Sequence, residues 1–279
     1  MLGIIDVGGG LRAIYGVGVF DRLMDEGACF DYCGGVSAGS ANVIAYISGQ
    51  RGRNYRFYTE YSMRKEYISL HNLLKSGSYI NLQYAYGTLS RSDGEDPLDY
   101  AQIQKSPVLL NVVATNALTG QAVYFSKQDV AQDQYDIFMA SSALPVFCKP
   151  YFIEGTPYYD GGISDPIPFE KAFADGCDRV AVILTRPIDY VRDGKRDQKL
   201  SRLIRQKYPH SAKALCDRYQ IYNGQVAKLK KLHLEDPNRL LVIAPDDCCG
   251  VDTLTREKEH LDQLYQKGYQ DAGNILKWL

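Results

Sequence analysis

The chain lacks several features that would by themselves suggest a function. Its 279 residues include no run that approaches the ~20 apolar residues of a membrane-spanning helix. The opening residues, MLGIIDVGGG, carry no charged region before an apolar stretch, so they do not resemble a secretory signal. We therefore expect a cytoplasmic protein. Histidine is also scarce, and its four copies are His71, His210, His233 and His260.

Charge and cysteine content exclude further classes. A net charge of -1 gives no global electrostatic reason to expect nucleic acid as a partner. The seven cysteines are scattered without the spacing of a zinc site, so we interpret them as reduced thiols. Hydrophobic residues make up 45% of the chain, which is ample for a folded core.

Apolar strand patterns and helical patterns alternate along the chain. Residues 2–7 predict a buried strand, 12–26 a helix that stops near Gly27, 30–36 a second strand and 37–48 a second helix. This order is typical of a parallel sheet covered by helices, so we expect an α/β fold. Later in the chain we expect strands at 108–114, 122–126, 179–184 and 239–244, a hairpin at 151–159, and helices at 200–234 and 255–279. The charged segment 190–199 predicts a surface loop.

The pentapeptide at residues 35–39 is a G-x-S-x-G motif with Ser37 at its centre. In such a motif the serine sits on a sharp turn between a strand and a helix, and Gly35 and Gly39 are needed because a Cβ there would meet neighbouring backbone. The helix N-terminus then stabilises developing negative charge. A chance match is the alternative, but the apolar strand before the motif and the small-residue helix after it favour a nucleophile.

Three consecutive glycines, Gly8, Gly9 and Gly10, follow the first strand. Their free backbone N–H groups could bind phosphate, but Ala13 stands where a dinucleotide fingerprint has its last glycine. Beside a nucleophile, an oxyanion hole is the simpler interpretation. Arg12 adds positive charge, although a lone arginine is more often structural or solvated.

A serine nucleophile needs a base. The order serine, acid, histidine of an α/β-hydrolase is met by Asp246 or Asp247 with His260, although His260 lies in a segment typical of a polar helix face. Asp160, followed by two glycines, is the better candidate. Tyrosines before it limit hydration and would raise its pKa. An ordinary Asp-Gly turn is the alternative.

Over residues 2–186 these motifs together resemble the patatin-like phospholipase family. The resemblance rests on residues 8–12, 35–39 and 160–162, with the Asp165–Pro168 and Ala140–Pro145 segments in support, while Val7 and Ala13 depart from the usual pattern. It implies a three-layer α/β/α fold with a mainly parallel central sheet. It also implies a catalytic core over residues 1–190, with residues 191–279 as a helical and strand extension packed on the same domain.

The resemblance also implies the chemistry. Ser37 and Asp160 would form a catalytic dyad that hydrolyses lipid or other acyl esters without a metal or cofactor. The N–H groups of Gly9 and Gly10, with Gly8 and Ala38, would form the oxyanion hole. Supporting roles would fall to Arg12, Gly35, Gly39, Gly161 and Gly162.

Two questions stay open at this stage. Residues 55–86 are rich in tyrosine with interleaved arginine, which predicts either a lid in peripheral contact with a membrane or ordinary core packing. A non-catalytic nucleotide- or lipid-binding protein is the rival to an enzyme. Head group, acyl chain length and oligomeric state are not determined by these patterns.

Overall fold

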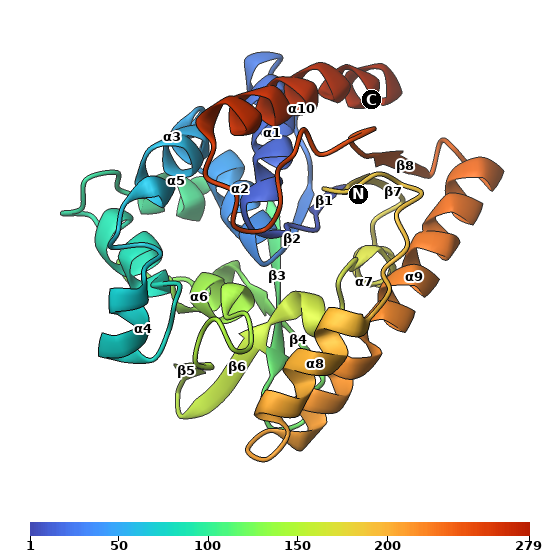
Figure 1. Ribbon diagram of the computed structural model, residues 1–279. Coiled ribbons are helices and arrows are strands. Elements are labelled where there is room, and N and C mark those ends of the chain that lie inside the picture. The colour runs from blue at the N-terminus through green and yellow to red at the C-terminus, as the bar shows by residue number, and fades with distance from the viewer.

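A single eight-stranded sheet forms the centre of the computed structural model, which describes residues 1–279 (Figure 1). The strand order is β5-β6-β3-β2-β1-β7-β8, and β4 pairs with β3 outside that path. The strands are β1 (Leu2–Asp6), β2 (Tyr32–Val36), β3 (Leu109–Asn116), β4 (Ala122–Ser126), β5 (Tyr151–Ile153), β6 (Thr156–Asp160), β7 (Arg179–Ile183) and β8 (Leu240–Ile243). All the predicted strands and the hairpin are therefore present, within one or two residues of the expected bounds.

Five neighbouring strands, β3-β2-β1-β7-β8, run parallel to one another, whereas β4, β5 and β6 pair antiparallel. The sheet is thus mainly parallel, as predicted. Because the carboxyl ends of parallel strands lie at one edge, the segments after β1, β2 and β7 come together there.

Two strands share one edge of β3. The register of β4 covers Asn111 to Thr115 of β3, which overlaps the partners of both β2 and β6. One residue can pair on only two sides, so β2 and β6 must both lie on the edge of β3 opposite β4. There β2 ends at Val36 opposite Val113, and β6 ends at Asp160 opposite Ala114. The two strands therefore meet end to end.

Helices cover both faces of the sheet (Figure 1). Alternate side chains of β1 show how the core is divided: Ile4 packs in a cluster with α1, α2 and α10, and Ile5 packs in a second cluster with α7 and α9. The helices are α1 (Ile14–Asp25), α2 (Ala38–Ile47), α3 (Arg53–Thr59), α4 (Leu70–Ser76), α5 (Tyr100–Lys105), α6 (Asp136–Ser142), α7 (Phe169–Ala174), α8 (Lys195–Ile204), α9 (Pro209–Glu235) and α10 (Lys258–Trp278). Short helical turns are η1 (Gly10–Ala13), η2 (Tyr61–Met63), the π-helix η3 (Gln83–Leu89), η4 (Lys127–Asp129) and η5 (Gly161–Ile163). None of the helices combines the length and apolarity needed to span a bilayer.

Two predictions in the C-terminal third were wrong. The helix expected at 200–234 is two helices, because Pro209 begins α9 and α8 ends at Ile204. A proline has no N–H for the preceding turn and is favoured at the first helical position. The segment 190–199 is also not simply a surface loop, since α8 begins within it and the side chain of Asp197 is buried. The seven cysteines are free, as expected.

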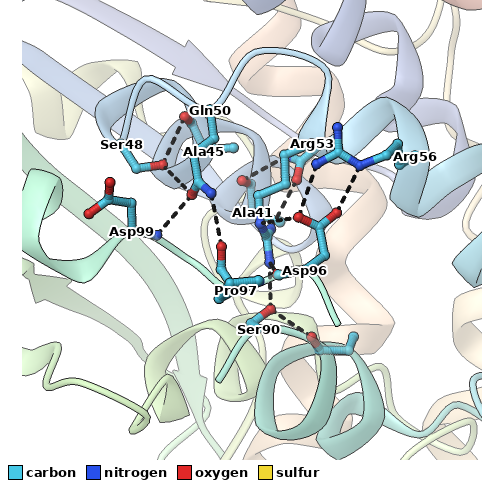
Figure 2. A network of polar contacts seen from close by, with 12 residues as sticks. Ala41, Ala45, Ser48, Gln50, Arg53, Arg56, Ser90, Asp96, Pro97 and Asp99 are labelled. Atoms are coloured by element: carbon cyan, nitrogen blue, oxygen red, sulfur yellow. Dashed lines mark hydrogen bonds and ion pairs between the residues drawn. The ribbon is translucent and has the colours of Figure 1, made fainter. Parts of the chain in front are cut away.

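A polar network holds together the segment between α2 and β3, residues 48–108 (Figure 2). Arg53 is buried and donates to Ser90 Oγ and to the Asp96 carbonyl, both at 2.8 Å. Arg56 donates to both carboxylate oxygens of Asp96 at 3.0 and 3.1 Å. Gln50 links Ser48 to the Pro97 carbonyl in the same network. These bonds link α3 to the loop before α5.

We predict that Asp96→Ala lowers the free energy of unfolding by about 3–5 kcal/mol, because it leaves the buried guanidinium of Arg53 without its counter-ion. Asp93→Ala is the matched control. Its partner Arg91 is half exposed, so the expected loss is about 0–1 kcal/mol. Urea unfolding of both variants measures the difference. Equal losses would show that the network does not support the fold.

Candidate active site

Ser37 occupies the turn between β2 and α2. Its backbone is in a positive-φ conformation (φ 56°, ψ -130°), which is rare for a residue with a side chain and is held by its surroundings. Its N–H donates to Ser141 Oγ at 2.8 Å, and its carbonyl accepts from Ser40 Oγ at 2.6 Å. The residue as a whole is 8% exposed. These bonds hold the hydroxyl at the carboxyl edge of the sheet.

The two motif glycines have the steric role that the pattern predicts. A Cβ on Gly35 would lie 2.5 Å from Ser40 Cα, and one on Gly39 would lie 2.8 Å from the carbonyl carbon of Asp6. Both distances are far below van der Waals contact. The close approach of α2 to β1 and β2 therefore requires glycine at both positions.

The three glycines after β1 form a loop against this turn. All three have positive φ, and a Cβ on Gly8 would lie 2.7 Å from the Gly39 nitrogen. The Gly8 N–H is not free, because it donates to Asp6 Oδ1 at 2.8 Å. The predicted contribution of Gly8 to an oxyanion hole is therefore wrong: its N–H is used to shape the loop. The Gly9 N–H has no acceptor within the chain.

Asp6 is the buried anchor of this loop. Its carboxylate accepts from Asn42 Nδ2 as well as from Gly8, both at 2.8 Å. Burial raises the pKa of Asp6 to about 6, and the two hydrogen bonds oppose that rise. A buried carboxylate therefore ties the end of β1 to the glycine loop and, through Asn42, to α2.

Asp160 ends β6 and is 1% exposed. Its Oδ1 accepts from the Gly162 N–H at 2.8 Å, while Oδ2 has no partner of good hydrogen-bond geometry. A Cβ on Gly161 would lie 2.5 Å from the Val113 carbonyl carbon, so only glycine allows the chain to turn beside β3 here. The two glycines after Asp160 thus form its turn and one of its hydrogen bonds.

The structure brings Asp160 and Ser37 together. Burial raises the pKa of Asp160, while the charge of Arg218 and, next in size, the Ser37 hydroxyl lower it. The hydroxyl is thus close enough to affect the carboxylate, although the pair is not aligned as an ideal hydrogen bond. Catalytic hydrogen bonds are often long in the absence of substrate.

An apolar cavity opens on one side of Ser37. It has about 730 Å³ of open space, and 13 of its 20 lining residues are hydrophobic. Its walls come from α2, α3, the π-helix and the chain around them, with Phe57, Tyr58, Tyr67 and Tyr86 among the lining residues. The aromatic segment 55–86 is therefore neither only core nor only surface, because several of its rings form the wall of this cavity.

A second, polar cavity, with about 1190 Å³ of space open to solvent, lies on the other side of Ser37. The glycine loop, Asp160 and Arg12 border it. Arg12 is buried, and its Nη1 donates to Thr253 Oγ1 at 3.1 Å. Burial, with repulsion from Arg186, lowers the pKa of Arg12 to about 10, so it keeps its charge at neutral pH. Ser37 and Gly10 line both cavities, and so they lie where the two meet.

The alternative triad is not assembled. Asp246 and Asp247 both form ion pairs with Lys267, and His260 lies beside Gly250 at the start of α10. None of the four histidines lines either cavity next to Ser37.

Several residues of the site were missed by sequence reasoning. Thr185 donates from Oγ1 to the Gly8 carbonyl, and Arg186 follows it into the polar cavity. Both come directly after β7, the parallel neighbour of β1, and the rule that sites form at the carboxyl ends of strands could have found them. Ser141, which holds the Ser37 N–H, lies in the Ala140–Pro145 segment singled out from the sequence. Arg218 and Thr253 carry no comparable signal.

Comparison with known proteins agrees with this architecture. A mainly parallel sheet with helices on both faces and a serine at a strand-to-helix turn is an arrangement typical of α/β acyl hydrolases. The sequence model of the patatin-like phospholipase family matches residues 7–173, and the chain belongs to that family. A domain of unknown function (DUF6363) matches residues 208–279.

One sequence relative and one solved structure can be named. The uncharacterized protein YjjU of Escherichia coli K12 is 29% identical over 199 residues, which is 67% of this chain and 52% of YjjU. The chain thus aligns with about half of that relative. The crystal structure of VipD from Legionella pneumophila aligns with 99% of this chain, and the alignment covers 66% of the VipD chain. The two share 14% sequence identity, and the TM-score is 0.48.

We predict that Gly8→Ala destabilises the protein more than Gly27→Ala does. Both glycines have φ near +65°, so alanine at either position costs about 1–2 kcal/mol for its backbone conformation. Only at Gly8 would the new Cβ overlap neighbouring backbone, whereas Gly27 has nothing within 4 Å. Chemical denaturation measures both free energies. A loss at Gly8 no larger than that at Gly27 would contradict the close packing of loop and turn.

Proposed function

We propose that the protein is a serine acyl hydrolase for lipid esters, of the phospholipase A, lysophospholipase or esterase type, which uses a Ser37–Asp160 dyad. The observation that carries the proposal is the position of Ser37, beside a buried carboxylate and at the junction of an apolar and a polar cavity. An ester with a long chain on one side and a polar alcohol on the other fits that junction.

In the proposed reaction Ser37 Oγ attacks the carbonyl carbon of the ester while Asp160 takes the hydroxyl proton. The tetrahedral intermediate then breaks its bond to the alcohol oxygen, which leaves with that proton. Water next attacks the acyl-enzyme, again losing a proton to Asp160, and the fatty acid leaves as Ser37 regains its hydrogen. Each proton passes between Asp160, substrate and water.

The negative oxygen of the intermediate needs donors. The Gly9 N–H has no acceptor in the chain, and Gly10 and Ala38 are first residues of helical turns, whose N–H groups have no intrahelical partner. We assign the oxyanion hole to these three groups. Arg12, whose Nη2 lies close to Gly9, adds positive charge beside them.

We assign the acyl chain to the apolar cavity. Its aromatic and aliphatic lining matches a hydrocarbon chain, and burial of each methylene would contribute about 0.8 kcal/mol. This assignment favours a lipid ester over a nucleotide, since the mainly hydrophobic lining suits a hydrocarbon chain better than the polar edges of a base and a ribose.

Ser37→Ala is expected to abolish both labelling by a fluorophosphonate probe and hydrolysis of p-nitrophenyl esters. Asp160→Asn should lower kcat/KM by at least about a thousandfold without loss of the fold, because it removes the base. His260→Ala is the control and should retain activity. An inactive His260→Ala beside an active Asp160→Asn would support the conventional triad instead. A wild-type protein that neither reacts with the probe nor cleaves an ester would refute the hydrolase.

The pH dependence of kcat/KM follows from the burial of Asp160. A base must be ionised, so activity should rise with pH through its pKa. Since burial raises that pKa, the acid limb should lie above the value of ~3.9 for a free aspartate. A pH series with a soluble ester measures it, and the protein's unfolding over the same range is the control. An acid limb at or below pH 4 would exclude Asp160 as the base.

A further inference from the structure

The polar cavity contains more positive charge than the chain itself neutralises. Its lining includes five arginines, Arg12, Arg186, Arg192, Arg196 and Arg218, and three aspartates, Asp160, Asp193 and Asp197. Only Arg192 and Arg218 have a carboxylate within 4.0 Å, and both use Asp197. Arg12, Arg186 and Arg196 have no ion pair. Asp160 is at the nucleophile and is not available as their counter-ion.

Two guanidinium groups of the cavity, those of Arg12 and Arg218, are also incompletely hydrogen-bonded. The Nε atoms of Arg12 and Arg218 are buried and have no partner. Unpaired buried donors are costly unless a ligand supplies the acceptor. Arg12 lies against Gly9, and Arg218 Nη2 lies 3.2 Å from the position that a Cβ would take on Gly162. The two cations therefore flank the loop and the turn that meet at Ser37.

The positive charges of neighbouring arginines also destabilise one another. The nearby charge of Arg186 disfavours the charged form of Arg12, and that of Arg192 disfavours the charged form of Arg218. Like charges at close range in a partly closed cavity are stabilised by an anion that can accept from several of them at once. A phosphate group has the oxygens and the charge to do so.

We propose that this cavity is a head-group site for a phosphomonoester, so that the preferred substrate is an acyl ester whose alcohol carries a terminal phosphate dianion. This inference rests on the proposed hydrolase function, because it names the alcohol side of the same ester. Most of the phosphate-binding cations, Arg186, Arg192 and Arg218, come from β7 onward, beyond the segment that matches the phospholipase family.

A zwitterionic choline head group fits this cavity less well. Recognition of a quaternary ammonium uses open aromatic faces. The guanidinium of Arg186 already stands 4.1 Å from the ring centroid of Tyr190, and Tyr222 packs edge-on against that same ring. The excess of cations would also repel the ammonium. The charge of the cavity therefore favours binding of a phosphomonoester over both a zwitterionic and a neutral head group.

Three substrates with one octanoyl chain test the proposal: octanoyl glycerol 3-phosphate, octanoyl glycerophosphocholine and octanoylglycerol. We expect kcat/KM for the phosphomonoester to exceed the other two by about tenfold or more, as charge-assisted hydrogen bonds would give. Arg186→Gln should remove most of that preference, because kcat/KM for the phosphomonoester should fall far more than kcat/KM for octanoylglycerol. This variant should fold, since Arg186 makes no ion pair or hydrogen bond within the chain. Arg202→Gln, on the exposed side of α8, is the control and should keep the preference.

A binding experiment separates this proposal from the hydrolase itself. The Ser37→Ala protein should be stabilised against heat by glycerol 3-phosphate at constant ionic strength, and Arg186→Gln in that background should lose the effect. Hydrolysis of all three esters at similar rates would overturn the head-group site and leave the hydrolase intact. Binding without any hydrolysis would support the site and refute the hydrolase. Equal stabilisation by inorganic phosphate would identify a free-phosphate site and overturn the substrate assignment.

Discussion

The meeting of β2 and β6 along one edge of β3 is the constraint on which the rest of the site depends. Since β4 occupies the opposite edge, the two strands can only end against each other, at Val36 and Asp160. The residue after the first strand and the last residue of the second are then neighbours. The same geometry requires a glycine at position 161, because the chain turns away from β6 there in direct contact with the Val113 carbonyl. Sheet topology, and not the local turn alone, brings a carboxylate to the serine.

Burial then gives Asp160 the property that the proposed reaction requires of a base. Asp160 is removed from water, which raises its pKa, and Arg218 and the Gly162 N–H keep that rise within bounds. A carboxylate with a raised pKa is a better proton acceptor than one in water. Under the proposed mechanism, Asp160 therefore serves as the base in place of a histidine. Under the proposed mechanism, the same arginine cluster that would bind a head group also adjusts the base.

The sequence was sufficient for the sheet and for the turn that carries Ser37, because both depend on local patterns. Strands of apolar residues bounded by glycine predicted β1 and β2, and G-x-S-x-G predicted the turn at Ser37. It misassigned the Gly8 N–H, because the acceptor, Asp6 Oδ1, was seen in the sequence only as part of a strand. It also missed Arg218, since this arginine is one of several charged residues along α9 and its proximity to Asp160 exists only after folding.

The C-terminal segment therefore has a part in the site that its sequence does not reveal. The phospholipase family match ends at residue 173, yet Thr185 holds the glycine loop, Thr253 holds Arg12, and Arg218 lies beside the turn after Asp160. These contacts come from the segment after β7, from the chain before α10 and from α9, all of which lie beyond the family match. Under the proposed mechanism, Ser37 and Asp160 carry out the reaction, and these later segments determine the charge around them. Differences in substrate between relatives that share the core should thus be sought in residues beyond it.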